Sequence, residues 1–273
     1  MMCQTDYIRH MGSINKARSN RIFVQLTLVF VLLSTNNVAQ GQSSPSNQDF
    51  LFAATGMGLA VGIELFIKDP YLPQQAKHSA PNPFDRRMRE KFYWGATKQS
   101  EAVKWSDRLI YGVSLSSLAW GPMFAKDHER SALINMEVFA VNSIVTNVVK
   151  ILSARERPYS HYGTSPSRGP RDYASFFSGH ASVAFSQAIT NAKMLSHAYP
   201  DSENLIWTSL LSLAGTTAYL RLAGDMHYFT DIVVGACVGS LIGWTITQHE
   251  LKRFDSRPSS QTGLMFTMKI PLG

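Results

Sequence analysis

The sequence IVVGACVGSLIGWTITQH, residues 232–249, decides the fold, because it contains no Asp, Glu, Lys or Arg. Apolar and polar residues do not alternate along it with a period of two, so a half-buried strand is disfavoured. Its length suits a helix that spans a bilayer or lies in the core of an all-α bundle. Gly235, Gly239 and Gly243 recur every four residues and would give this helix a smooth face for close packing.

Four further apolar runs precede this one and are separated from it and from each other by polar connections. They are residues 50–67, 109–125, 132–149 and 205–220. Together with residues 232–249 and one more polar helix, they predict an all-α helical bundle of about five to six core helices that is embedded in a membrane.

The more polar helix is expected over residues 181–199. It carries Gln187, Asn191, Lys193 and His197, which would make it a poor lipid-facing segment. We therefore expect this helix inside the bundle, surrounded by the more apolar helices.

Composition excludes several classes of protein. Of the 273 residues, 45% are hydrophobic and 16% are charged, which excludes a disordered chain. The two cysteines, Cys3 and Cys237, exclude a disulfide scaffold, and no Cys/His spacing suits a structural zinc site. The net charge of +7 suits an anionic partner, and by itself it leaves nucleic acid, phosphorylated substrates and lipid headgroups open. The mean hydropathy of −0.08 is low for a bundle that lies wholly in a bilayer.

The chain divides into four parts. We expect a signal peptide or N-terminal anchor in 1–41; a linker, a first apolar helix and a basic polar segment in 42–108; a helical core in 109–250 that carries the candidate functional residues; and a C-terminal tail in 251–273. The first part has basic residues before an apolar run at 22–33, and small residues at 39–41 suit cleavage. Within the second part, residues 86–92 are either a short interfacial helix or a solvated loop.

A first cluster of chemically capable residues follows the apolar run 132–149. Lys150 ends that run, and a cation at a helix C-terminus is favourable by itself. Arg155 and Arg157 follow directly before Pro158, and two further arginines exceed what capping needs. This concentration of positive charge suits a bound phosphate.

A second cluster, Ser178-Gly179-His180, stands directly before a helical stretch. Ser178 suits an N-cap, and Gly179 allows the backbone to approach an anion closely. Backbone N–H groups at a helix start bind anions readily. His180 in the first turn is placed to give a proton to a leaving oxygen, although the motif alone is also a common helix cap.

A third cluster contains Arg221, His227 and Asp231. His227 and Asp231 are four residues apart, so on a helix they share one face. A carboxylate there accepts a hydrogen bond from one imidazole nitrogen and leaves the other nitrogen as a nucleophile. Arg221 ends the preceding apolar run, and its guanidinium can fork onto phosphate oxygens. Three such clusters together argue against ordinary polar loops.

These clusters resemble type 2 phosphatidic acid phosphatases, whose superfamily includes bacterial non-specific acid phosphatases and vanadium haloperoxidases. The resemblance rests on Lys150 followed by Arg157-Pro158, on Ser178-Gly179-His180, and on Arg221, His227 and Asp231, in that order. Two neighbouring positions depart from the family pattern. Phe177 stands where the family usually has Pro, and Leu220 stands where it usually has Ser.

The resemblance implies a role for each motif residue. His227 would attack phosphorus and form a phosphohistidine, Asp231 would orient His227, and His180 would protonate the leaving alcohol and then activate water. The groups expected to bind phosphate are Lys150, Arg157, Ser178, Gly179 and Arg221. No metal or other cofactor would be required, except vanadate in a haloperoxidase. Three extra arginines, Arg155, Arg168 and Arg171, are expected to be solvated or to face lipid headgroups.

The sequence therefore predicts a metal-independent phosphatase for a phosphomonoester or pyrophosphate of a membrane lipid, with no nucleic-acid partner. The alternatives are a soluble periplasmic acid phosphatase, a vanadium-dependent haloperoxidase and a non-catalytic bundle that binds anionic lipid. We expect an exported protein, in the inner membrane with a site that faces the periplasm, or in the periplasm itself. A periplasmic site requires that one of the early apolar runs does not span, and residues 50–67 are the weakest candidate.

Overall fold

The computed structural model describes residues 45–64 and 68–255 of the chain. These residues form helices and loops without a β-strand, so the prediction of an all-α fold is confirmed. The signal peptide or anchor predicted in residues 1–41 lies outside the described residues, as does most of the predicted C-terminal tail.

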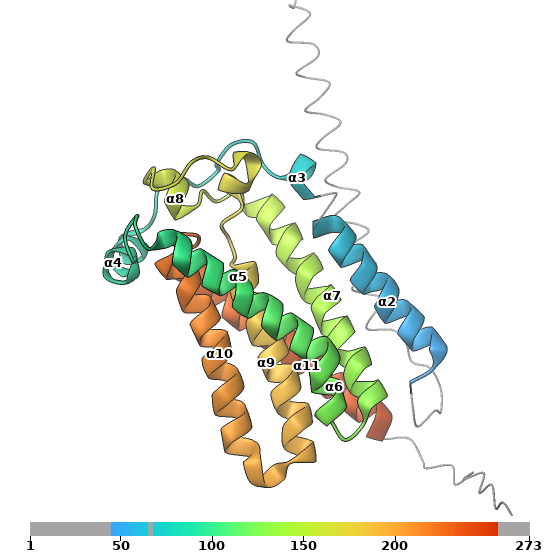
Figure 1. The fold of residues 1–273 in the computed structure, drawn as a ribbon. Coiled ribbons are helices and arrows are strands. Elements are labelled where there is room, and N and C mark those ends of the chain that lie inside the picture. The colour runs from blue at the N-terminus through green and yellow to red at the C-terminus, as the bar shows by residue number, and fades with distance from the viewer. Residues whose placement is uncertain (1–44, 65–67, 256–273) are drawn as a thin grey trace, which may run out of the picture.

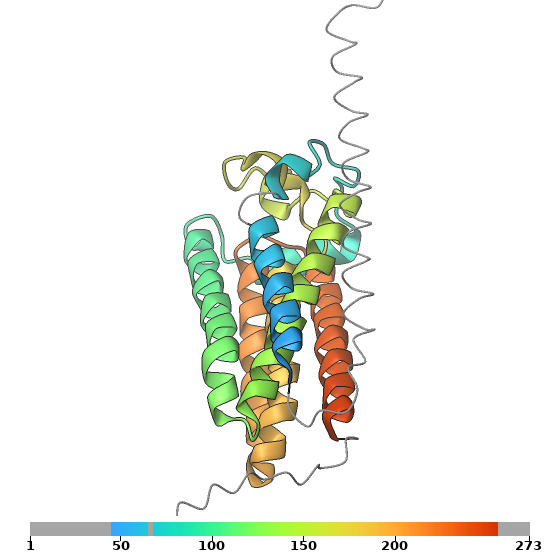
Figure 2. The same ribbon diagram turned by 90° about the vertical axis from the view of Figure 1, so that its right-hand side faces the viewer.

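Six helices of 16 residues or more make up the bundle in the described part of the chain. They are α2 (Asn47–Gly62), α5 (Gln99–Leu115), α7 (His128–Ser153), α9 (Gly179–Ala198), α10 (Glu203–Ala223) and α11 (Phe229–Asp255). Successive long helices run in opposite directions along one axis (Figures 1 and 2). The number agrees with the five to six core helices expected.

Several helix boundaries differ from the predicted apolar runs, most of all at the start of α5. The helix expected from Leu109 begins at Gln99, because its first half is amphipathic rather than uniformly apolar. Ala102 and Ser106 of this half are buried on the same helix face as Ile110. Charged residues lie between them, so this half does not form the uninterrupted apolar run on which the prediction relied. At the other end of the core, α11 continues to Asp255, past the boundary expected at residue 250.

Helix α9 lies at the centre of the bundle and contacts α5, α7, α10 and α11. Its polar side chains find partners there. The Asn191 amide donates to Oδ1 of Asn135 and to Oγ of Ser117, both at 3.0 Å. The expectation that this more polar helix lies inside the bundle is therefore confirmed, and hydrogen bonds between side chains offset the cost of burying them.

The glycines of α11 allow it to approach α9 closely. A Cβ atom added at Gly239 would lie 2.1 Å from the carbonyl oxygen of Ser182, a distance that no side chain tolerates. The other two glycines meet serines of α9 that are also spaced by four residues. The facing pairs are Gly235 with Ser178, Gly239 with Ser182, and Gly243 with Ser186. The close packing that the glycine spacing predicted is thus present.

Two of the described helices, residues 128–153 and 229–253, are long and apolar enough to cross a membrane. The apolar window of the second is only 28% buried in the bundle, and Val233, Leu241 and Trp244 lie exposed on its surface. Two such helices support membrane association only weakly, because core helices of soluble proteins meet the same criteria.

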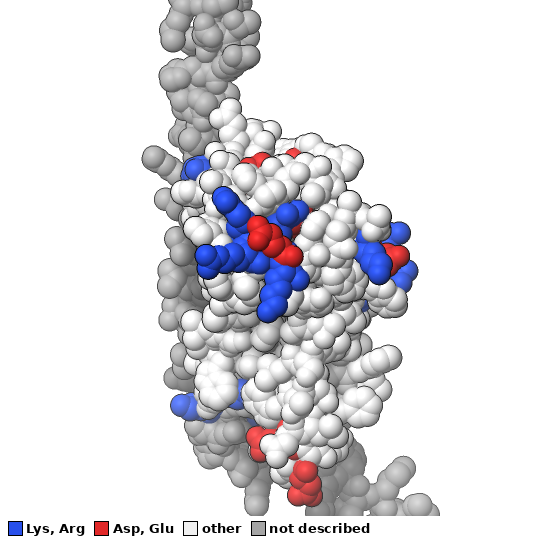
Figure 3. All heavy atoms as spheres, turned by 90° about the vertical axis from the view of Figure 1, so that its left-hand side faces the viewer, with Lys and Arg blue, Asp and Glu red and all other residues white. Residues whose placement is uncertain are grey.

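Short helices and loops cover one end of the bundle. They include α3 (Lys68–Tyr71), α4 (Pro83–Phe92) and α8 (Pro158–His161) (Figure 1). Residues 86–92, for which the sequence left two interpretations, are helical, and Arg86, Arg87 and Lys91 are exposed there. Figure 3 shows Lys and Arg side chains gathered at this level, with a largely uncharged surface beneath them.

Candidate active site

The residues predicted from the three clusters meet at this covered end of the bundle. The ends of α7 and α10 and the starts of α9 and α11 converge there, although they are far apart in the sequence (Figure 1). A cavity of about 420 Å³ opens among them. Six predicted site residues line it: Lys150, Arg157, Gly179, His180, Arg221 and His227. Ser178 and Asp231 lie directly behind this lining, where the Ser178 N–H donates to the Asp231 carbonyl oxygen.

His227 lies in the loop before α11 and is almost fully buried. Its Nε2 is 3.1 Å from Nη1 of Arg157, and because a guanidinium only donates, Nε2 accepts and the proton resides on Nδ1. Nδ1 is 3.7 Å from Oδ2 of Asp231. Burial lowers the pKa of His227, and the positive charges of Arg157, Arg221 and Lys150 lower it further. The imidazole is thus held neutral with the lone pair on Nε2, as a nucleophile requires.

Arg157 joins three parts of the site. Its guanidinium donates to the carbonyl oxygens of Arg171 at 2.9 Å, Ala174 at 3.0 Å and Met226 at 2.8 Å. These bonds fix the side chain between the loop before α9 and the loop that carries His227. Arg157 therefore links His227 to the loop before α9.

His180 lies in the first turn of α9, and its Nε2 is 2.9 Å from Oδ1 of Asp107 on α5. The same carboxylate oxygen accepts from Nη1 of Arg221 at 2.8 Å. Burial lowers the pKa of His180 to about 3, with help from the charges of Arg221 and Lys150, while Asp107 acts in the opposite direction. Asp107 was not among the predicted site residues, because nothing in its local sequence distinguishes it from an ordinary helix-surface carboxylate.

The start of α9 packs closely against the end of α7. Ser178 caps α9 by accepting a hydrogen bond from the Ala181 N–H. A Cβ added at Gly179 would lie 3.1 Å from Cγ2 of Thr146 and 3.3 Å from Nζ of Lys150. Gly179 therefore lets the lysine ammonium lie beside the positive end of the helix, where both attract an anion.

A family comparison agrees with this geometry. The model of the PAP2 superfamily matches residues 131–255 of the chain. This part of the protein belongs to the PAP2 superfamily. PAP2 membership is consistent with phosphatase activity. A search among curated proteins gave no significant match.

The PAP2 superfamily is generally metal-independent. Among residues 45–64 and 68–255, no three side chains of His, Cys, Asp or Glu are grouped so that they could hold a metal ion. The charged groups that line the cavity are cationic apart from Glu64, and Arg168 and Arg171 lie exposed along its lining.

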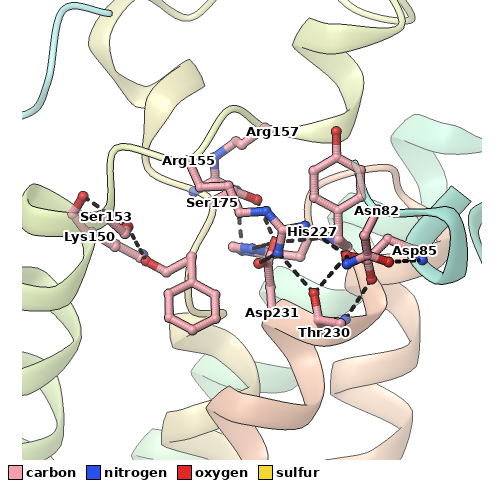
Figure 4. Close-up of polar contacts among 12 residues, drawn as sticks. Asn82, Asp85, Lys150, Ser153, Arg155, Arg157, Ser175, His227, Thr230 and Asp231 are labelled. Carbon is pink, nitrogen blue, oxygen red and sulfur yellow. Dashed lines mark hydrogen bonds and ion pairs between the residues drawn. The ribbon is translucent and has the colours of Figure 1, made fainter. Parts of the chain in front are cut away.

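The observed environment of Arg155 contradicts one of the predictions. It was expected to be solvated or to face lipid, but its side chain is only 14% exposed and donates to both Asp231 and Asp85 (Figure 4). It also stacks on the ring of Tyr228, with 4.4 Å between the guanidinium carbon and the ring centroid. The physical reason is that two fully buried carboxylates need a cation between them.

Asp231 accepts hydrogen bonds from several donors. The Ser175 hydroxyl donates to its Oδ2 at 2.6 Å, and the backbone N–H of Tyr228 does so at 3.0 Å. Because α11 begins at Phe229, His227 precedes the helix rather than sharing a helical face with Asp231. Asp231, in the first turn of α11, faces back toward the preceding loop, but its Oδ2 lies 3.7 Å from Nδ1 of His227, beyond hydrogen-bond distance, so the hydrogen bond expected from the spacing is not formed in this structure.

Helix α4 supports the PAP2 domain from outside the matched residues. Asp85 accepts from the backbone N–H of Thr230 at 2.9 Å and from its hydroxyl at 2.7 Å (Figure 4). Arg89 donates to Asp225 at 2.6 and 2.8 Å, two residues before His227. The sequence analysis missed these partners, because each pair is separated by more than 130 residues.

Proposed function

We propose that this protein is a phosphatase that hydrolyses a phosphomonoester or pyrophosphate of a membrane lipid through a phosphohistidine on His227. The observation that carries the proposal is the two-ended chemistry of the cavity. Cations and histidines line the end at the starts of α9 and α11, and apolar side chains of four helices, interspersed with Ser114, Ser143 and Asn147, line the part that extends between the helices.

The polar end supports the following reaction. His180 first takes up a proton on Nδ1, which the negative charge of the entering phosphate group favours. Nε2 of His227 then attacks phosphorus, the bond from phosphorus to the leaving oxygen breaks, and His180 gives that oxygen its Nδ1 proton. In the second step His180 takes a proton from water, the resulting hydroxide attacks phosphorus, and the bond to Nε2 breaks. Inorganic phosphate leaves, and both histidines return to their starting states.

The cations at this end stabilise charge on the transferring group. Lys150, Arg157 and Arg221 line the cavity together with the start of α9, so positive charge and backbone N–H groups lie on several sides of the phosphoryl group. As that group approaches, the Nη1 of Arg157 turns from Nε2 of His227 to a phosphate oxygen. Such fixed donors act strongly in a site that excludes water.

The apolar end supports a lipid as substrate. The apolar residues that line this part of the cavity are Val61 of α2, Ile110 and Tyr111 of α5, Phe139 of α7 and Val183 of α9; the polar ones are Ser114, Ser143 and Asn147. Phe139 lies three turns before Lys150 on α7, so this end extends roughly 16 Å from the phosphate level at 1.5 Å per residue. An acyl or prenyl chain fits such a slot, whereas a sugar phosphate leaves it empty.

The test compares phosphate release from a long-chain lipid phosphate, a short-chain analogue and an aryl phosphate, by purified protein in detergent with EDTA. We expect a higher kcat/KM for the long-chain substrate. Phe139→Ser should lower the ratio of kcat/KM between the long-chain and short-chain substrates about tenfold, because roughly 1–3 kcal/mol of apolar contact with the chain is lost. Leu241→Ser, on the exposed face of α11, is the matched control.

Equal kcat/KM for all three substrates would overturn the lipid assignment and favour a soluble acid phosphatase. Release from none of them would overturn the phosphatase itself and favour peroxidation or lipid binding alone.

We propose that the site faces the periplasm. Support comes from α2, whose 16 residues span about 24 Å at 1.5 Å per residue, less than the roughly 30 Å of a bilayer core. If α2 does not cross, an exported N-terminus leaves the active-site end outside.

The test places single cysteines at Ser167, near the site, and at Ser202, at the other end of the bundle, in a chain with Cys3 and Cys237 replaced by Ala. In intact cells an impermeant thiol reagent should label only Ser167→Cys. Labelling of only Ser202→Cys would reverse the orientation.

A further inference from the structure

Asp107 connects two residues of the active site that the sequence treats as separate motifs. Its Oδ1 lies 2.9 Å from Nε2 of His180 and 2.8 Å from Nη1 of Arg221. His180 and Arg221 both line the cavity, whereas Asp107 is not part of the lining. The carboxylate therefore bridges these two residues without lining the cavity itself. Asp107 also precedes the PAP2 match at residues 131–255.

The hydrogen bond determines which nitrogen of His180 carries its resident proton. An ionised carboxylate only accepts hydrogen bonds, so Nε2 of His180 is protonated and donates to Asp107. Nδ1 is then the nitrogen that exchanges a proton with substrate and water. The pKa of Asp107 itself lies below its ordinary value, because the hydrogen bond from His180 and the charge of Arg221 outweigh the effect of burial.

We propose that Asp107 is the positioning residue of His180, which holds the imidazole by Nε2 and stabilises its protonated form for proton transfer from Nδ1. This inference rests on the proposed function. It makes the site a set of two His–Asp pairs, one on the attacking side and one on the leaving side of phosphorus.

The surroundings of His180 explain the need for a carboxylate. The charged groups that face it are Arg221, Lys150 and Asp107, and the two cations together with burial disfavour the imidazolium. Asp107 is the only one of these three that favours it. Without the carboxylate of Asp107, even less of His180 would be in the imidazolium form that donates the proton in the first step.

A purely structural role predicts something different. Asp107 would then matter only as a partner of Arg221, which also donates to Oγ of Ser106 at 3.0 Å. Loss of that contact would disturb phosphate binding, and it would affect all phosphate esters alike. Proton donation matters only when the leaving oxygen is basic, so the leaving group separates the two roles.

The experiment measures alcohol release in the first turnover by Asp107→Asn, with an alkyl phosphate and with a nitrophenyl phosphate. On the alkyl ester we expect a loss of about 100-fold, which is the usual contribution of a general acid, and on the nitrophenyl ester a loss of less than about threefold. Asp107→Glu should recover part of the alkyl rate. Glu101→Gln, an exposed residue on the same helix, should leave both rates unchanged.

Equal losses on both esters, or no loss on either, would overturn the role of Asp107. Circular dichroism identifies a variant that fails to fold, in which case Asp107→Glu decides. The wild type separates the two proposals: if it hydrolyses neither ester and forms no phosphohistidine, the proposed function fails, whereas a fully active Asp107→Asn removes only this inference.

Discussion

His227 and His180 both lie close to an aspartate, but the two pairs are built differently. The side chain of His227 is 1% exposed, and its Nδ1 is 3.7 Å from Asp231, a carboxylate already engaged by Arg155, Ser175 and the Tyr228 backbone. The side chain of His180 is 28% exposed, and its Nε2 is 2.9 Å from Asp107. The pair that sequence spacing predicts is therefore the looser one, and the tighter pair joins residues 73 positions apart.

The largest effect should come from removing the proposed nucleophile. His227→Ala should lower phosphate release by at least about a thousandfold, because no other group forms the covalent intermediate. Neither an alkyl nor an aryl phosphate should rescue it, and radiolabelled substrate should leave no phosphohistidine. His249→Ala, exposed near the end of α11, is the control. A labelled His227→Ala protein would place the nucleophile elsewhere.

Removing His180 should have a large effect that depends on the substrate. His180→Ala should lower the first-turnover rate on an alkyl phosphate by roughly 100- to 10,000-fold. On a nitrophenyl phosphate the first turnover should be much less affected, and phosphohistidine should accumulate, because water is no longer activated. Rapid-quench labelling measures both quantities. If phosphohistidine fails to accumulate, His180 is not the base of the second step.

Removing Arg155 should affect the His227–Asp231 pair and not the His180–Asp107 pair, because Arg155 contacts only Asp231 of these residues. Arg155→Met leaves the buried carboxylates of Asp231 and Asp85 without their cation, so we expect a loss of about 3–5 kcal/mol of stability and a fall in activity of about tenfold or more. Arg155→Lys should recover part of both. The readouts are the unfolding midpoint in denaturant and kcat, with exposed Arg86→Met as control. Wild-type stability in Arg155→Met would contradict the bridging role.

The smallest effect is on the pH dependence of stability. The folded-state pKa of His227 lies well below the ordinary histidine value of about 6.5, so the unfolded chain binds more protons than the folded protein as pH falls below about 6.5. The contribution of neutral His227 to the free energy of unfolding is thus fully present above that pH. It declines below that pH, by at most about 1.4 kcal/mol per pH unit. Between pH 7 and 5, the melting temperature of His227→Gln should fall less than that of the wild type.

His180→Gln should change this slope in the same direction but by less, because its side chain is partly exposed. Melting followed by circular dichroism at several pH values measures all three proteins. Identical slopes would mean that neither histidine is kept neutral by the fold.

The sequence predicted the framework of the site because its signals are local. Capping at Ser178, the end of an apolar run at Lys150 and the glycine spacing of α11 each depend on residues a few positions apart. The prediction failed where the signal is not local. Arg155 looks like a surface cation until Asp85 and Asp231 are brought to it, and the start of α5 is too polar to stand out as an apolar run.

The sequence by itself determined the all-α fold, the central position of α9 and the three clusters, because hydrophobic runs and motif spacing report on burial and chemistry along the chain. Only the tertiary structure decided which partners each group has. Asp85, Arg89 and Asp107 come from α4 and α5, and packing brings them to histidines and loops 70 or more residues away. Such pairings depend on how helices cross in space, which no spacing within one segment encodes.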